Sequence, residues 1–225
     1  MTGSGKAEQG AATRDALLTS AREAFAEHGY AQTAVDDIVE RADVTKGAFY
    51  HHFSGKKEIF VRVFEEVKKE LSRAAFVTHV DHEPFGASEE RRRRLNRFVE
   101  QDNDEVWVQL VERCRRYVEL HTAPEFRRIT LDDARGVLTW SERQRVESEY
   151  GVVLLRADLR RAMRRGILRQ LPLRELSVIL TGALNEACLL IAHAEDNEDT
   201  RENALAVLDE FLNALRVSEE GGGDR

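Results

Sequence analysis

The feature that most constrains the fold is the spacing of apolar residues, which is helical along nearly the whole chain. The 225 residues include only three prolines, and the sequence shows no sustained alternation of β-branched residues. Apolar residues instead recur at intervals of three and four, which is the period of one face of an α-helix. In residues 56–78 such a face carries Ile59, Phe60, Val63, Phe64, Val67 and Leu71. The sequence therefore predicts an all-α protein.

Capping and stop signals divide this pattern into about nine to ten helices. Thr13 is a suitable N-cap for the first helix, Thr33 for the second, and Gly29 and Gly166 are suitable stops. The predicted helices cover residues 13–28, 33–42, 45–53, 56–78, 105–121, 124–132, 138–165, 172–194 and 203–215. Residues 79–103 are the least regular part and are interpreted as a loop followed by a highly charged helix.

The chain is expected to divide into four parts. Residues 1–12 are small, polar and glycine-containing, which indicates a flexible arm. Residues 13–57 hold three short helices, residues 58–216 form a larger helical domain, and residues 217–225 are expected to be a disordered tail.

The overall charge and hydropathy exclude several classes of protein. A net charge of −7 argues against a general polyanion binder. No apolar run approaches the roughly 20 residues that span a bilayer, and the N-terminus lacks the apolar core of a secretory signal. We therefore expect a cytoplasmic protein without a membrane partner. Cys114 and Cys188 have no C-x-x-C spacing and are expected to be buried thiols, with a redox pair as the alternative.

The segment "TKGAFYHHF" (residues 45–53) breaks this acidic balance. Residues 44–57 contain three lysines, two histidines and no acid, whereas residues 36–43 contain four acids and Arg41 alone. On a helical wheel one side of the segment carries Phe49, His52 and Phe53, and the other carries Lys46, Gly47, Tyr50 and His51. Lysine and tyrosine can contact phosphate or base edges, and glycine permits close approach of a backbone.

Two short helices joined by a tight turn and braced by a preceding helix form the helix-turn-helix layout, whose second helix enters the major groove. Thr33 and Lys56, at the starts of the flanking helices, could clamp phosphates. From these residues alone, a merely solvated charged surface remains an alternative.

The stretch from Ala21 to Phe60 contains F-x-x-x-G-Y-x-x-T, I-x-x-x-A-x-V-x-K-G-x-F-Y-x-H-F and K-x-E-I-F in order. It strongly resembles the N-terminal domain of the TetR/AcrR family of bacterial transcriptional regulators. The resemblance implies that eight residues occupy DNA-contacting positions: Thr33, Thr45, Lys46, Gly47, Ala48, Tyr50, His51 and Lys56. It also implies that the larger domain serves ligand binding and dimerisation.

Residues 173–194 have an apolar face too wide for a simple surface helix, and Gly182 and Ala183 permit close approach of another helix. With the stripe on residues 203–215, this predicts a four-helix bundle across a two-fold axis, although both helices could instead close the core of one subunit. The predicted interface consists of Leu176, Leu180, Ala183, Leu184, Ala187, Ile191, Leu205, Leu208, Phe211 and Leu212.

A ligand pocket is expected among the helices 56–78, 105–121, 124–132 and 138–165. Its candidate lining residues are Phe64, Val67, Leu71, Trp107, Leu110, Cys114, Tyr117, Phe126, Trp140 and Tyr150. The competing interpretation is that they are core residues. Tryptophan and tyrosine bring polar groups to an apolar site, which would suit a flat or amphipathic ligand.

The remaining motifs indicate neither a metal site nor a cofactor site, and they predict that the protein is not an enzyme. "HVDHE" at residues 79–83 has metal-ligand residue types, but such residues in a loop are usually solvated. The run Arg91–Arg94 follows two glutamates and is interpreted as a charged helix face rather than a nucleic-acid patch. Neither a glycine-rich phosphate loop nor a catalytic motif such as H-E-x-x-H occurs.

The sequence therefore predicts a dimeric repressor that binds double-stranded DNA at a palindromic operator and is released by an unidentified small-molecule ligand. An alternative is a DNA-binding regulator whose larger domain binds a protein partner. A third hypothesis is a helical scaffold without a role on DNA.

Overall fold

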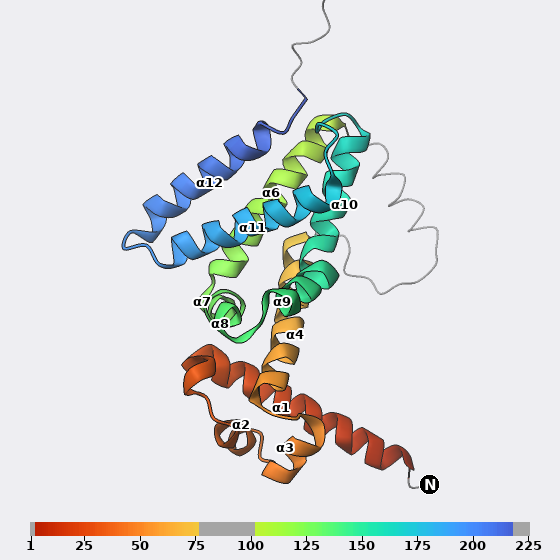
Figure 1. The fold of residues 1–225 in the computed structure, drawn as a ribbon, viewed down its shortest axis with the longest axis vertical. Helices are drawn as coiled ribbons and strands as arrows, with labels where there is room; N and C mark the ends of the chain where they lie inside the picture. The colour runs from red at the N-terminus through yellow and green to blue at the C-terminus, as the bar shows by residue number, and fades with distance from the viewer. Residues whose placement is uncertain (1–2, 77–101, 218–225) are drawn as a thin grey trace, which may run out of the picture. The chain divides into compact units, whose positions relative to one another are not determined.

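The computed structural model describes residues 3–76 and 102–217, which fall into two compact units (Figure 1). The first unit combines the chain up to residue 70 with residues 123–147, and the second combines the rest. The described residues contain helices and one isolated bridge between Leu168 and Arg216. The all-α prediction is therefore confirmed. The division at residue 57 is not reproduced, because residues 123–147 group with the N-terminal helices.

Helix α1 (Gly3–Gln32) opens the first unit and begins earlier than predicted. The flexible arm expected at residues 1–12 is wrong for residues 3–12, where α1 continues through three glycines. The alanine, lysine, glutamate and glutamine residues among them are good helix formers, and no proline interrupts them. The predicted stop at Gly29 is confirmed, because this residue has φ 79° and ψ 166° and interrupts α1.

Three further helices complete the N-terminal part: α2 (Val35–Arg41), α3 (Lys46–His52) and α4 (Lys56–Phe76). The N-cap of α2 is Ala34, whose N–H donates to the Asp37 carboxylate at 2.7 Å. The interior of this part is aromatic and aliphatic, with Phe25, Phe49, Phe53, Ile59 and Phe60 all buried. The rings of Phe25 and Phe60 meet edge to face at 5.2 Å between centroids.

The second part of the first unit is helical from Pro124 onward. It consists of α7 (Pro124–Arg127), the π-helical segment η1 (Arg128–Asp133), α8 (Ala134–Val137) and α9 (Trp140–Val146). A second π-helical segment, η2 (Glu147–Gly151), follows. The sequence did not predict either π-helical segment, because the apolar spacing of so short a stretch does not distinguish hydrogen bonding from i to i+4 from bonding from i to i+5.

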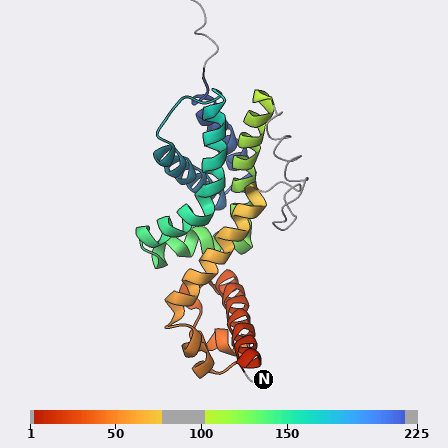
Figure 2. The same ribbon diagram turned by 90° about the vertical axis from the view of Figure 1, so that its right-hand side faces the viewer.

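The second unit contains α6 (Asn103–Thr122), α10 (Val152–Arg164), α11 (Leu173–Ala192) and α12 (Asn197–Asn213). Helix α11 packs against α6, α10 and α12 (Figures 1 and 2). Helix α12 begins six residues before the predicted start at 203, because the Asp196 carboxylate caps it by accepting from the N–H groups of Glu198 and Asp199.

Helix α11 is long and apolar enough to cross a membrane by length and composition alone, with a mean hydropathy of 1.5. The expectation that no segment would approach this limit is therefore wrong for α11. However, 44% of its apolar window is buried, and Leu180, Leu184 and Cys188 are fully covered. The core helix of a folded domain has the same properties, so this feature is weak evidence for a membrane span.

Candidate nucleic-acid interface

Helix α3 presents a short surface whose direction is fixed by two buried phenylalanines. Phe49 is fully buried and Phe53 is 2% exposed, as the helical wheel predicted. The Thr45 hydroxyl caps the helix by accepting from the Ala48 N–H at 3.2 Å. Tyr50 is 53% exposed, and its ring leans edge to face on Phe49. The aromatic core of the unit therefore holds the opposite face of α3 outward.

Six of the eight predicted DNA-contacting residues lie on this outward surface. The six are Thr45, Lys46, Gly47, Ala48, Tyr50 and His51. Ala48 is half-buried, and the other five residues are exposed. They occupy the N-cap and two turns of one helix. The arrangement fits a helix that lies in the major groove of DNA.

The remaining two predicted contacts, Thr33 and Lys56, have internal partners. Thr33 is 1% exposed, and its hydroxyl donates to the carbonyls of Gly29 at 2.8 Å and Ala24 at 3.2 Å. It therefore neither caps α2 nor presents a hydroxyl to phosphate. The Lys56 ammonium donates to the carbonyls of Tyr30 and Thr33, both at 2.8 Å, and lies over the Tyr30 ring. In this structure both side chains hold the turn between α1 and α2, and their contacts with DNA stay predictions.

The positive charge of the outward surface is balanced by neighbouring acids. Lys46 Nζ lies 2.7 Å from Asp36 Oδ1, and this hydrogen bond raises the pKa of Lys46. Lys57 pairs with Glu142 at 2.9 Å. Ion pairs between exposed side chains are weak because water screens them, so Lys46 can exchange its carboxylate for a phosphate at little cost. The role of Asp36 was missed, because a count of charges along the sequence does not reveal which ones meet.

Gly47 has no conformational or steric reason to be glycine within the chain. It has no positive φ, and an added Cβ would meet only the Thr45 hydroxyl at an ordinary 3.8 Å. Alanine would favour the helix by up to about 1 kcal/mol. A bare backbone at this exposed position would suit a partner that approaches α3 from outside.

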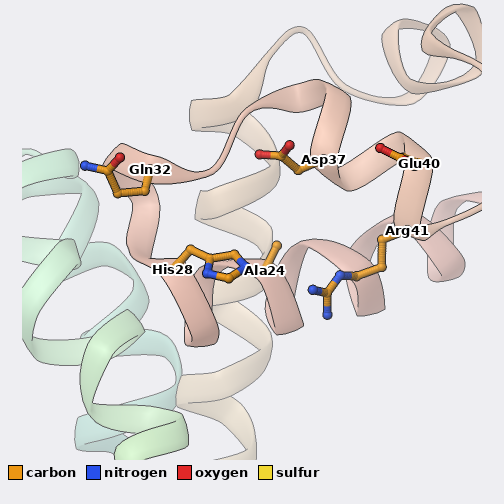
Figure 3. A pocket seen from close by; sticks show the side chains of 6 residues that line it. All are labelled: Ala24, His28, Gln32, Asp37, Glu40 and Arg41. Atoms are coloured by element: carbon orange, nitrogen blue, oxygen red, sulfur yellow. The ribbon is translucent and has the colours of Figure 1, made fainter.

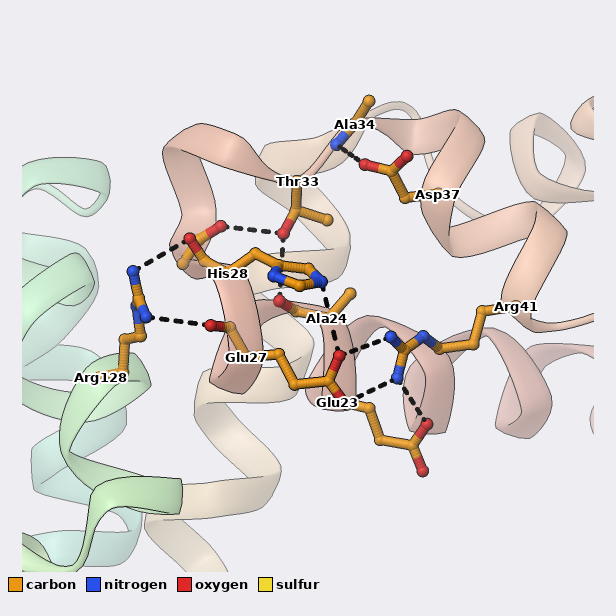
Figure 4. A network of polar contacts seen from close by, with 10 residues as sticks. Glu23, Ala24, Glu27, His28, Thr33, Ala34, Asp37, Arg41 and Arg128 are labelled. Atoms are coloured by element: carbon orange, nitrogen blue, oxygen red, sulfur yellow. Dashed lines mark hydrogen bonds and ion pairs between the residues drawn. The ribbon is translucent and has the colours of Figure 1, made fainter.

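A groove of about 560 Å³ lies between α1 and α2 and carries both acidic and basic side chains (Figure 3). Its lining residues are Ala24, His28, Gln32, Asp37, Glu40 and Arg41. Arg41 is bound by Glu27 at 2.6 Å and by Glu23 at 3.3 Å, and the hydrogen bond from Arg41 lowers the pKa of Glu27 (Figure 4). The groove does not extend the surface of α3 toward a polyanion.

The ten predicted pocket residues are divided between the two units, and none of them lines this groove. Seven of them are buried: Phe64, Val67, Leu71, Trp107, Leu110, Cys114 and Tyr117. Phe126 and Tyr150 are half-buried, and Trp140 is 68% exposed at the start of α9. Trp140 is therefore corrected to a surface residue. The Tyr117 hydroxyl donates to Asn185 at 2.6 Å.

The predicted dimer interface also needs correction. Seven of its ten residues are covered within the chain and belong to the core: Leu176, Leu180, Leu184, Ala187, Ile191, Leu208 and Leu212. Ala183 and Leu205 are half-buried, and Phe211 is 40% exposed. The apolar residues that α11 and α12 leave exposed are Ile179, Leu190, Val207 and Phe211. The apolar stripe of α11 was assigned to the wrong side, because its core face and its outer face are both apolar.

The other candidate sites give little chemistry. Within residues 3–76 and 102–217, no group of three or more metal-ligand side chains is placed to hold a metal ion. The "HVDHE" motif and the run Arg91–Arg94 lie outside the described residues. Cys114 and Cys188 are buried thiols, and burial raises the pKa of Cys114 to about 12, which keeps its thiol protonated.

The fold and the outward surface of α3 define the class: a helix-turn-helix, DNA-binding transcriptional regulator. Comparison with known proteins gives the family. Residues 17–63 match the model of bacterial regulatory proteins of the tetR family, and residues 107–215 match the tetracyclin repressor-like C-terminal domain. The chain is 30% identical to a TetR-family transcriptional regulator from Pectobacterium atrosepticum, with a TM-score of 0.69, and the match covers 94% of this chain and 97% of that one. The chain belongs to the TetR family.

Two further relatives are informative. The probable acrEF/envCD operon repressor of Escherichia coli K12 is 35% identical over 75 residues, which cover 32% of this chain and 34% of that protein. The chain thus matches about a third of the length of this curated relative. The structure of RolR in complex with resorcinol is 18% identical, with a TM-score of 0.61 over 95% of this chain and 98% of that one, and shares the fold.

Proposed function

We propose that the protein is a homodimeric repressor that binds a palindromic operator and is released from it by a small molecule. The observation that carries the proposal is the outward surface of α3, where Thr45, Lys46, Gly47, Tyr50 and His51 are exposed above buried Phe49 and Phe53. Lysine and tyrosine supply donors for phosphates and base edges, and Gly47 leaves room for the DNA backbone.

The exposed apolar residues of α11 and α12 support a dimer. Ile179, Leu190 and Val207 are each at least 60% exposed and Phe211 is 40% exposed, and a second copy of the same surface would cover them. A dimer places two reading helices in half-sites about one turn of DNA apart, which explains why the operator would be a palindrome.

A ligand in the larger domain would regulate this binding. The structure of RolR, which shares the fold, contains resorcinol, and the candidate pocket residues of this chain are aromatic and aliphatic with a few polar groups. A protein partner in place of the small molecule is the second candidate function, and exposed Trp140 favours it, because an exposed tryptophan is typical of protein contact surfaces. In both versions the protein acts in the cytoplasm by binding rather than catalysis.

The test is selection of bound DNA from random fragments by the purified protein, at a stated salt concentration. The selection is repeated with Tyr50→Ala and with Trp140→Ala, which removes an exposed aromatic side chain elsewhere. We expect the wild type and Trp140→Ala to recover one palindrome and Tyr50→Ala to lose it. Weak, salt-sensitive binding without a motif, equal in all three proteins, would refute the proposal.

A further inference from the structure

The last turn of α1 is held by a side chain from a distant part of the sequence. Arg128, the first residue of η1, donates from Nη1 to the carbonyl of Glu27 and from Nη2 to the carbonyl of His28, both at 3.0 Å (Figure 4). Carbonyls at the end of a helix lack intrahelical partners and carry partial negative charge. The guanidinium therefore caps α1 at the point where the helix is interrupted.

Gly29 is the residue that makes this cap possible. Its φ of +79° lies in the left-handed region, and a Cβ at this position would lie 2.8 Å from Arg128 Nε. On the far side of the glycine, the N–H of Tyr30 donates to Asp133 Oδ2 at 2.8 Å. Arg128 and Asp133 thus hold the backbone immediately before and immediately after Gly29.

The same turn sets the position of the reading helices. The Thr33 hydroxyl donates back to the Gly29 carbonyl, and Lys56 donates to the carbonyls of Tyr30 and Thr33. Helix α2 begins two residues later, at Val35, and packs against both α1 and α3. A change in the backbone around Gly29 would therefore shift α2, and with it the outward surface of α3.

The π-helical winding of η1 allows Arg128 and Asp133 to reach this turn together. The two residues are five positions apart, and hydrogen bonding from i to i+5 brings residue i+5 closer to the side of residue i than an α-helix does. In an α-helix of 3.6 residues per turn they would point about 140° apart. Rewinding η1 as an α-helix would therefore break one of the two contacts.

The chain itself connects η1 to the larger unit. Residues 123–147 follow directly on α6 and lead, through η2, into α10, and both of those helices belong to the second unit. A rearrangement of α6 or α10 can thus reach η1 through covalent connections at both ends.

We propose that η1 is a regulatory element of the DNA-reading unit: Arg128 and Asp133 hold the turn at Gly29 in the conformation that reads DNA, and rewinding η1 releases it. This inference rests on the proposed function. Arg128 and Asp133 are positioning residues, since they act through the turn and have no part in the outward surface of α3.

The experiment uses the full chain and the operator recovered by DNA selection. Operator affinity and non-specific affinity are measured over a range of salt concentrations for Arg128→Ala, Arg128→Lys, Asp133→Ala and Asp133→Asn. The control is Arg116→Ala, which removes an exposed arginine whose ion pair, with Glu119, lies within α6. Hydrogen exchange is followed at the amides of residues 30–35 and 128–134, with and without operator DNA.

We expect faster exchange at residues 30–35 and at least tenfold weaker operator binding in Arg128→Ala and Asp133→Ala, with unchanged non-specific affinity and salt dependence. Asp133→Asn should behave as wild type because its amide oxygen still accepts from Tyr30, and Arg128→Lys should be intermediate. Operator DNA should slow exchange across η1 in the wild type and not in Arg128→Ala. If an alanine variant does not fold, the conservative variants Asp133→Asn and Arg128→Lys still test the proposal.

Three outcomes would overturn the inference. Unchanged exchange at residues 30–35 would mean that the contacts do not hold the turn. Faster exchange at residues 30–35 with unchanged operator affinity would mean that these contacts have a structural role only. A salt slope reduced by about one would mean that Arg128 binds a phosphate directly. Failure of the wild type to recover any motif would instead overturn the proposed function, while the exchange measurement would still report on the turn.

Discussion

At the scale of single residues, burial decides what a polar side chain can do. The resemblance to TetR-family regulators places Thr33 at a DNA-contacting position, yet its hydroxyl is buried and donates to two backbone carbonyls. We expect Thr33→Val to lower the free energy of unfolding by about 1 kcal/mol, because it removes a buried donor and leaves its acceptors. The salt dependence of operator binding should not change. Urea unfolding and binding titrations at several salt concentrations measure both quantities.

Lys46→Met provides the comparison for Thr33→Val. The Lys46 side chain is 56% exposed on α3, and its ammonium can exchange Asp36 for a phosphate. Lys46→Met should therefore reduce the slope of log K against log[salt] by about one. A similar reduction in Thr33→Val would show that Thr33 binds phosphate after all, and would contradict the internal role.

Substitution of Gly47 should stabilise the fold and weaken DNA binding. Gly47→Ala introduces a Cβ that meets ordinary van der Waals contact within the chain, so we expect it to raise the free energy of unfolding by up to about 1 kcal/mol. The same methyl group projects from the outward surface of α3 and should weaken operator binding by at least tenfold. A variant that is more stable and binds equally well would show that DNA does not approach the backbone at this position.

At the scale of elements, the start of α9 has a capping box that also carries charge. Glu142 accepts from the Thr139 N–H at 2.7 Å and pairs with Lys57 of α4. The hydrogen bond from the Thr139 backbone, followed by that from Lys57, lowers the pKa of Glu142 from 4.5 to about 2. A carboxyl group whose pKa is lower in the folded chain than in the unfolded chain stabilises the fold at pH values above its pKa in the unfolded chain. This contribution is lost as the pH falls toward its pKa in the folded chain.

Glu142→Gln should therefore be less stable than the wild type between pH 4.5 and 7, and the difference should disappear as the pH approaches 2. Urea midpoints across this range measure the difference. Thr139→Ala is the matched variant, because it removes the cap hydroxyl without changing the charge, and it should cost about 1 kcal/mol. A difference between Glu142→Gln and wild type that stays constant down to pH 2 would show that the charge of Glu142 has no effect.

The sequence predicted the elements better than it predicted what joins them. The order Phe49, His52, Phe53 on one face of a short helix was sufficient to orient α3, and Gly29 was a visible stop. Arg128 and Gly29 lie 99 positions apart, so no local pattern could reveal that the glycine makes room for a guanidinium. The π-helical winding of η1 was hidden for the same reason, since it is visible only in the positions of Arg128 and Asp133 relative to α1.

At the scale of the whole molecule, the proposal depends on two copies of the chain. Helix α11 carries apolar residues on its core face and also on part of its outer face, so its sequence could not separate the side that closes the core from the side that would face a partner. Burial separates them: Leu180 and Leu184 are fully covered, whereas Ile179 and Val207 are 62% and 68% exposed. Only the second pair is free to contact another subunit.

Ile179→Glu and Val207→Glu should therefore convert a dimer into a folded monomer. Both positions are exposed within the chain, so the charge costs little in the monomer, but in a dimer it would be buried without a partner. Sedimentation should show a mass falling from twice 25.7 kDa to 25.7 kDa, with helicity unchanged. Leu180→Ala is the contrasting variant: it should lower the free energy of unfolding by about 2–5 kcal/mol through a core cavity without specifically dissociating the dimer.

Dimerisation and operator binding are thermodynamically coupled. Each monomer carries one reading helix, so a monomeric variant should bind one half-site, and its affinity for the full palindrome should fall to nearly that for an isolated half-site. By the reciprocity of coupled equilibria, the operator should drive the weakened subunits back into a dimer by the same factor. Footprinting of half-site and full-site DNA with Ile179→Glu measures this. Full-site affinity equal to that of the wild type would mean that the two reading helices are held together by a surface other than α11 and α12.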